Sequence, residues 1–258
     1  MSDWLHELPV PWIAVVVLVA VSALVAVVYF IVMRLAVGGR GAAMQAVSPG
    51  LLPALGIVFA LIVGFLAAGV WGDSDKAKDA VSNEASALRS VVLLSDELPA
   101  ATAARMRALV RRHVEDAVHR EWPAMQDRDA SLAAIPAPLV EAQHLALAFD
   151  ARRPGQIDAQ RELVSALQRA LEARRQRIIV SDSHVNALKW IGLLVLATVM
   201  LVAIACVHSA NRRSALAALS LYAAAVVVVS VMLVAQDEPF TGHLGQSPEP
   251  LEQVIPQT

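Results

Sequence analysis

Four long stretches of the 258-residue chain contain no Asp, Glu, Lys or Arg, and polar residues gather between and beyond them. These apolar stretches cover residues 11–33, 51–72, 190–208 and 214–235. Each of them approaches or exceeds the roughly 20 residues that a helix needs to cross the hydrocarbon core of a bilayer. The pattern therefore predicts an all-α integral membrane protein with four transmembrane helices.

The region between the second and third apolar stretches is polar and has helical periodicity. Apolar side chains recur at three- and four-residue steps in residues 77–95 and again in residues 102–122. Pro123 should end or kink the second of these helices, because proline lacks an amide proton and clashes with the preceding turn. A further long helix begins near Ile157 and continues toward the third apolar stretch. We expect a helical extramembrane domain here.

These boundaries divide the chain into four parts. Residues 1–72 hold the N-terminal tail and two transmembrane helices, and residues 73–187 form the extramembrane domain. Residues 188–236 form a hairpin of two transmembrane helices, and residues 237–258 form a C-terminal tail. Because two spans precede the domain and the number of spans is even, both termini should lie on the same side of the membrane as the domain.

The basic residues support two opposite orientations of the chain in the membrane. The two short loops carry four arginines and no acidic residue, which favours a cytoplasmic position for these loops under the positive-inside rule. These are Arg34, Arg40, Arg212 and Arg213. The flanks of the long polar region carry six basic residues, Lys76, Lys78, Arg89, Arg174, Arg175 and Arg177. Because the flanks supply more basic residues than the loops, we expect the domain and both termini in the cytosol.

Composition narrows the class of protein further. Apolar residues make up 57% of the chain and charged residues 17%, against roughly 45–50% and about 25% in soluble domains, which excludes a soluble enzyme. The balance of 21 basic and 23 acidic residues gives no nucleic-acid footprint. The single cysteine, Cys206, excludes an intrachain disulfide. The preference for Arg over Lys, with abundant Ala and Val, indicates a bacterial protein and hence the inner membrane.

One helix carries a cluster that resembles metal ligands, namely His113, Glu115, Asp116, His119 and Glu121. Metal sites in helical bundles repeat a carboxylate-x-x-His unit on facing helices, and this unit occurs here once. We interpret the cluster as surface ion pairing. The chain also has no phosphate loop, nucleophile elbow or zinc motif. We therefore expect no enzyme activity, no metal and no cofactor.

The second span places small residues at strict four-residue spacing, at Gly56, Ala60, Gly64, Ala68 and Gly72. Small residues at this spacing let two helix backbones approach closely in a membrane. We expect this face to contact another helix, either in the same chain or in a neighbouring subunit. No span has an ionisable residue at its middle depth, which disfavours pumps and coupled transporters and leaves a passive pore open.

Two charged residues fall within the apolar stripes of their helices. Glu84 lies in the stripe of residues 77–95, and Arg174 lies in the stripe of the helix that precedes the third span. A charge on a packing face is costly unless it is paired, so these two side chains should meet. Arg177 is the alternative partner. The competing interpretation is that both side chains reach solvent from the edge of the stripe.

Several short motifs together resemble the bestrophin-like family of bacterial and plant membrane proteins. The motifs are Gly64-Phe65-Leu66 before Trp71, Glu84-Ala85-Ser86-Ala87-Leu88, Leu98-Pro99, Glu121-Trp122-Pro123, the Arg174-x-x-Arg177 pair, and Asp237-Glu238-Pro239-Phe240-Thr241-Gly242. The resemblance covers nearly the whole chain in layout.

The last motif is also similar to the Asn-Pro-Phe-Gly stretch after the final span of true bestrophins, which are pentameric anion channels. The resemblance implies a homo-oligomer, such as a pentamer, with a central pore for small anions such as chloride. The chain lacks the acidic calcium clasp of true bestrophins, so calcium gating is not implied. The alternative is a membrane-anchored helical interaction or sensor module without transport activity.

Overall fold

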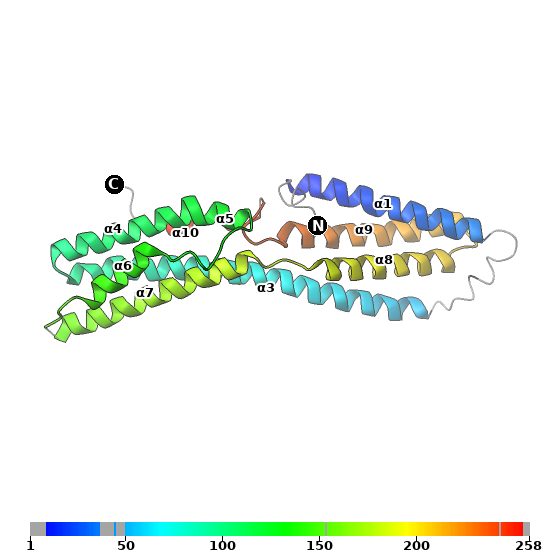
Figure 1. Ribbon diagram of the computed structural model, residues 1–258. Coiled ribbons are helices and arrows are strands. Elements are labelled where there is room, and N and C mark those ends of the chain that lie inside the picture. The colour runs from blue at the N-terminus through cyan, green and yellow to red at the C-terminus, as the bar shows by residue number, and fades with distance from the viewer. Residues whose placement is uncertain (1–8, 37–43, 45–49, 153, 243, 255–258) are drawn as a thin grey trace. The chain divides into compact units, whose positions relative to one another are not determined.

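A computed structural model describes residues 9–36, 44, 50–152, 154–242 and 244–254 (Figure 1). These residues form helices and connecting segments, with no strand among them. The N-terminal tail up to residue 8 and Arg40 lie outside the described residues. The chain divides into two compact units. We call them the apolar unit (described residues up to Gly72, 184–238, 242 and 244) and the polar unit (73–183, 239–241 and 245–254).

The helices of the apolar unit match the four apolar stretches of the sequence. They are α1 (Val10–Leu35), residues 51–72 of α3 (Leu51–Leu94), α8 (Ala187–Val207) and α9 (Arg212–Gln236). All four are long and apolar enough to cross a membrane. Asparagine caps begin two of them: the Asn186 side chain accepts the Leu188 amide, and the Asn211 side chain accepts the Arg213 amide. For the described residues, the predictions of an all-helical fold and of four helices apolar enough to span a membrane are confirmed.

Packing within the apolar unit is uneven. Helices α1, α8 and α9 bury a shared cluster that includes Val28, Val32, Leu201 and Leu219. The first part of α3 contributes Leu66 and Val70 to a smaller cluster, which includes Leu193 and Leu233. Within the most apolar stretch of each helix, only 6% of the residues of α3 are buried, against 39% of those of α8. The spanning part of α3 is therefore the least covered of the four.

The polar unit is a bundle in which several helices pack around one core. Its elements are residues 73–94 of α3, η2 (Ser95–Glu97), α4 (Ala100–Asp116), η3 (Ala117–Glu121), α5 (Trp122–Gln126), α6 (Ala137–Leu147), α7 (Pro154–Ser181) and α10 (Glu249–Glu252). The predicted stripes face the core. Their fully buried members include Val81 and Leu88 on α3, Met106 and Val110 on α4, and Leu167 on α7.

Pro123 acts on the backbone several residues before itself. The α-helical pattern of α4 stops at Asp116, and one π-helical turn, η3, follows before α5. The Trp122 amide bonds to the carbonyl of Ala117, five residues earlier. Because Pro123 has no amide proton and its ring crowds the preceding turn, a wider turn accommodates it. The chain therefore continues past the proline as α5 instead of stopping.

The C-terminal segment belongs to the core of the polar unit. Phe240, Leu251 and Val254 are all nearly fully buried within the main cluster. Gly245 is required where the segment folds on itself, because a Cβ there would lie 2.9 Å from the carbonyl carbon of Phe240. The sequence predicts only a tail here, whereas the segment packs into the core of the polar unit.

Candidate functional site

The polar unit encloses a cluster of five ionisable side chains. They are Glu84 on α3, His113 on α4, Glu121 on η3, and Arg174 and Arg177 on α7. Glu84 and Arg177 are completely buried, and His113 and Arg174 are nearly so. The Glu121 side chain retains 18% exposure. We call these five residues the charge network.

Arg177 lies at the centre of the charge network. Its Nε donates to Glu84 Oε2 at 2.7 Å, and its Nη2 donates to Glu121 Oε2 at 2.7 Å. Nη2 also lies 3.3 Å from Glu84 Oε1, so the guanidinium holds Glu84 with two nitrogens. Nη1 faces Met125 Sδ at 3.4 Å, and the guanidinium carbon lies 5.7 Å from the centroid of the Trp122 ring. Each nitrogen of the buried guanidinium thus has an acceptor, and the Trp122 ring adds a cation–π contact.

The remaining members extend the network at both ends. His113 Nε2 lies 2.9 Å from Glu84 Oε1, and it donates because an ionised carboxylate can only accept. Arg174 Nε donates to Glu121 Oε1 at 2.7 Å, and its Nη2 donates to the carbonyl of Ala134 at 3.1 Å. Two carboxylates therefore balance two guanidinium groups. This balance is the condition under which charges are tolerated in a protein interior.

Electrostatics keep the central pair ionised. Burial by itself raises the pKa of Glu84, but the charge of Arg177 and the hydrogen bond from His113 outweigh it and lower that pKa to about 2. Burial lowers the pKa of Arg177, but the nearby Glu84 carboxylate raises it by more. Each carboxylate already accepts from at least two donors. The network therefore clamps α3, α4, η3 and α7 together and offers no free acid or base.

The π-helical turn positions one end of the network. It brings Glu121 to Arg177 and Arg174, while the next residue, Trp122, is 4% exposed and packs on the guanidinium of Arg177. The Trp122 ring also meets the Phe240 ring edge-on, with centroids 5.3 Å apart. Two sequence motifs that are far apart in the chain, at residues 121–123 and 237–242, thus meet at the Trp122–Phe240 contact.

Other residues of the last motif have separate local roles. Within the apolar unit, Asp237 Oδ1 accepts the Val185 amide at 2.7 Å. Within the polar unit, the Pro239 carbonyl accepts the Gln246 amide at 2.8 Å. Gly242 has φ 74°, in the left-handed region that side-chain-bearing residues rarely adopt. These residues shape the segment and are not members of the charge network.

The structure corrects the expected pairing. Glu84 binds Arg177, the alternative partner, and the first choice, Arg174, binds Glu121 instead. Arg174 and Arg177 lie about one turn apart on α7, so a small difference in helix register decides which one is level with Glu84. The competing interpretation, in which both side chains reach solvent, is also wrong because Glu84 is completely buried and Arg174 nearly so.

The expected surface pairing of His113 is a second error. His113 is 1% exposed and binds Glu84. The sequence did contain the signal, because His113 lies between Val110 and Val114 on the apolar stripe of its helix. Among the described residues, no group of three or more His, Cys, Asp or Glu side chains is placed to hold a metal ion.

The small-residue face of α3 lies outside the network, in the apolar unit. A Cβ added at Gly56, Gly64 or Gly72 would meet no atom within 4 Å. Ala60 and Ala68 are exposed as well. Of the two partners that the sequence left open, a helix of the same chain is therefore not seen in contact with this face within the described ranges.

Comparison with known proteins identifies the family. The model of the Bestrophin-like domain matches residues 19–251, which is nearly the whole chain. No curated protein and no solved structure matches the chain. The matched range contains most of α1, the other three apolar helices, the charge network and the Asp237–Gly242 motif. The chain therefore belongs to the bestrophin-like family.

Proposed function

We propose that the protein is a homo-oligomeric passive channel for small anions such as chloride, in the bacterial inner membrane. One observation carries the proposal: the small-residue face of α3 is uncovered by the described chain. Membrane helices associate through close backbone contact at Gly and Ala, and lipid cannot provide that contact. Neighbouring copies of the chain would cover this face and could enclose a pore, with a pentamer as the size that the family resemblance implies.

The absence of coupling charges supports a passive mechanism. Away from their ends, the four apolar helices carry no Asp, Glu, Lys or Arg. Pumps and ion-coupled transporters place such groups inside the membrane to bind and release their ions. A passive pore can select ions with backbone dipoles and with charges at its rim.

We also propose on which side of the membrane the polar unit lies. The polar unit and both termini lie in the cytosol, because an even number of spans keeps the termini together and the flanks of the polar unit carry the larger set of basic residues. The partners are then the lipid bilayer, further copies of the chain and small ions.

Ion flux into liposomes tests the proposal. The purified protein should release chloride down its gradient when a counter-ion path is supplied, and it should pass sodium or gluconate poorly. Gly64→Leu should reduce both flux and oligomer formation, because the new side chain occupies the contact face. Gly192→Leu is the matched control, since Gly192 on α8 also has open space around it but lies outside the stripe.

The outcomes separate the two functions. An oligomer that passes no ion over a wide panel would refute the channel. A monomer without flux would favour a membrane-anchored interaction or sensor module. Equal loss of flux in the Gly64 and Gly192 variants would show that the stripe has no special role.

A further inference from the structure

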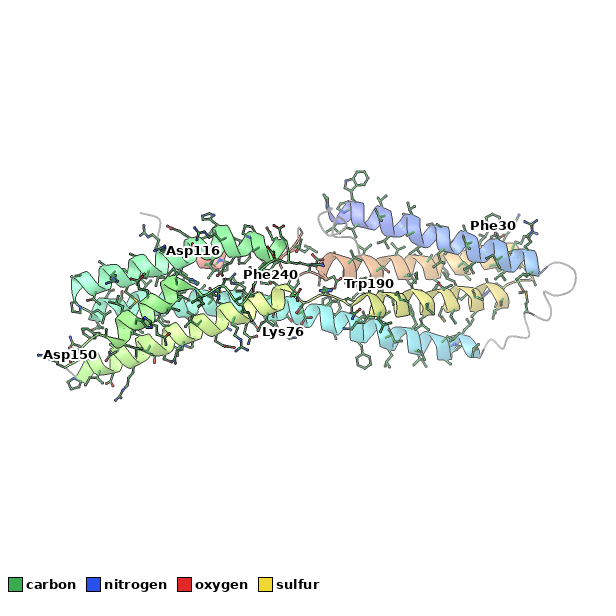
Figure 2. The ribbon with its side chains drawn as sticks, viewed as in Figure 1. Phe30, Lys76, Asp116, Asp150, Trp190 and Phe240 are labelled. Atoms are coloured by element: carbon green, nitrogen blue, oxygen red, sulfur yellow. The ribbon has the colours of Figure 1, made fainter. Side chains whose placement is uncertain are left out.

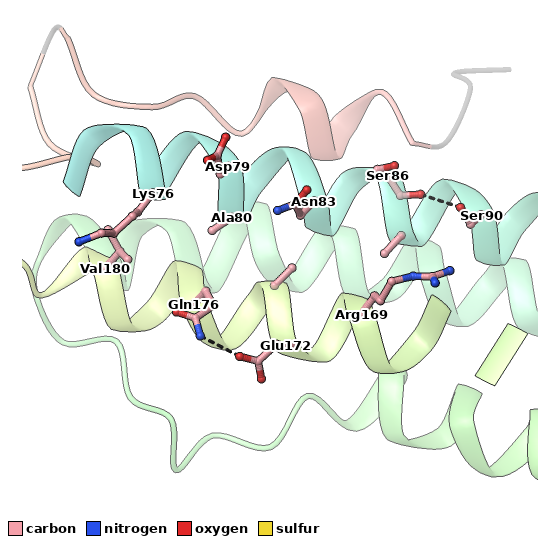
Figure 3. A pocket seen from close by; sticks show the side chains of 12 residues that line it. Lys76, Asp79, Ala80, Asn83, Ser86, Ser90, Arg169, Glu172, Gln176 and Val180 are labelled. Carbon is pink, nitrogen blue, oxygen red and sulfur yellow. Dashed lines mark hydrogen bonds between the residues drawn. The ribbon is translucent and has the colours of Figure 1, made fainter. Parts of the chain in front are cut away.

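The polar unit carries an open groove between α3 and α7 (Figure 3). Its volume is about 560 Å³. Its nearly buried floor consists of small or short apolar residues, namely Ala80, Ala87, Ala173 and Val180. Glu84 lies about one turn from both Ala80 and Ala87 on α3, so the Glu84–Arg177 pair joins the two helices along this floor.

The rim of the groove is polar, and its unpaired side chains all lie on α3. In the part of the chain that the structure describes, the side chains of Asp79, Asn83 and Ser86 have no hydrogen-bond partner, whereas the polar side chains of α7 are paired. The α3 side of the groove runs from Lys76 to Ser90, which corresponds to about 21 Å of helix. A groove with this length and a floor of small residues suits one face of a helix that itself carries small side chains.

The outer face of α4 has those properties. Ala101, Ala104 and Ala108 are all exposed on it. The same face presents Arg111 and Arg112, which make no ion pair with any described residue. Two free cations on this face match the free carboxylate of Asp79 in the groove. The other carboxylate of the groove, Glu172, is exposed but already accepts from Gln176 and lies 3.5 Å from Arg175.

We infer that the α3–α7 groove of one copy receives the outer face of α4 from the next copy. This inference rests on the proposed homo-oligomer and names the surfaces that join it in the polar unit. Because the two surfaces are different parts of the same unit, the contact is head-to-tail. Contacts of this kind produce closed rings when the rotation closes.

The charge network sets the register of the contact. Glu84 and His113 touch, so they lie at one level of the bundle. Ser90 lies six residues beyond Glu84 on α3, and Ala108 lies five residues before His113 on α4, which runs in the opposite direction. At about 1.5 Å per residue, Ser90 lies about 9 Å and Ala108 about 7.5 Å from that level, on the same side of it.

A ring whose axis runs along these helices keeps each residue at its own level, so Ala108 of one copy faces Ser90 of the next. By the same reasoning, Arg111 and Arg112 fall between the levels of Glu172 and Asp79. Their long side chains can then reach either carboxylate, and the charges of the two surfaces agree with the register.

Cysteine cross-linking in native membranes tests the inference. The variant carries Ser90→Cys and Ala108→Cys with Cys206→Ser, which removes the only natural thiol. Mild oxidation should produce a ladder of bands at multiples of 27.5 kDa on a non-reducing gel, and the ladder should collapse on reduction. The two single-cysteine variants and the pair Ser82→Cys with Ala108→Cys are controls, because Ser82 is exposed on α3 outside the groove.

Each outcome decides the inference. No ladder in the test pair, while native mass measurement shows an oligomer, would overturn the groove contact and leave the proposed function standing. Dimers alone would contradict a ring. A monomer in the native measurement would end both proposals. Equal cross-linking of the Ser82 control pair would show that contact is random collision, and this would also overturn the inference.

Discussion

The polar and apolar units differ in whether their own residues cover and pair the side chains that need partners. The polar unit pairs its buried charges internally, since the completely buried Arg177 binds two carboxylates of the same unit. The apolar unit leaves large side chains uncovered, such as Phe65 on α3 at 71% exposure and Phe30 on α1 at 69%. Figure 2 labels Phe30 on α1. The polar unit therefore has a self-contained core, whereas the apolar unit exposes apolar side chains that lipid and, under the proposed function, other subunits would cover.

Breaking the charge network should lower the stability of the polar unit more than any other change. Arg177→Met leaves Glu84 and Glu121 without their shared cation inside the polar unit. Loss of one partner of a buried pair costs about 3–5 kcal/mol of unfolding free energy. Thermal unfolding followed by circular dichroism in detergent should show a strongly lowered Tm.

The matched control for this variant is Arg161→Met on the same helix. The side chain of Arg161 is 78% exposed, and its nearest carboxylate, that of Asp158, lies at 3.7 Å. Exposed pairs contribute under about 1 kcal/mol, so the Tm should hardly change. Similar losses in both variants would contradict the view that burial makes the network important.

Removing the aromatic contact at the C-terminal segment should have the next largest effect. Phe240→Ala deletes a ring that is 2% exposed and packs on Trp122, and we expect a loss of about 3 kcal/mol. Limited proteolysis should then cut the C-terminal segment faster than in the wild type. Phe65→Ala on α3 is the control, because that ring is exposed. An unchanged cleavage rate would refute a structural role for Phe240.

Acid should weaken the polar unit through Glu84. The pKa of this carboxyl is about 2 in the folded protein against an ordinary value of 4.5. A lowered folded pKa gives stability that is complete above about pH 4.5 and is lost as the pH falls toward 2. Tm measured over this range should fall less steeply in Glu84→Gln than in the wild type. An equally large change in the exposed Glu162→Gln would contradict this assignment.

The sequence predicts the helical elements well because their signals are local. Charge-free runs mark the four apolar helices, and the three- and four-residue steps mark the faces that are buried in the polar unit. The burial of Glu84 follows from the same periodicity, since it lies between Val81 and Leu88 on one stripe.

Features that depend on register or on irregular backbone could not be predicted. The choice between Arg174 and Arg177 requires the offset of α7 against α3 to within one turn, which no local pattern contains. Glu121 reaches the network through a π-helical turn, and Phe240 and Leu251 enter the core from a segment without periodicity. Each of these depends on tertiary packing.

The smallest effect on the stability of a single copy should come from the α3 face. Gly64→Leu meets open space, so the Tm of the isolated subunit should change little, while association should be lost. Gly192→Leu should leave both unchanged. A large drop in subunit Tm for Gly64→Leu alone would show that this face packs within the chain, contrary to the comparison of the two units.

Native mass spectrometry from lipid nanodiscs tests the proposed homo-oligomer, because it counts the copies of the chain in each assembly. We expect one defined species at a multiple of 27.5 kDa, which Gly64→Leu converts to single copies and Gly192→Leu preserves. A wild-type protein that stays at 27.5 kDa at every concentration and in every lipid would contradict it.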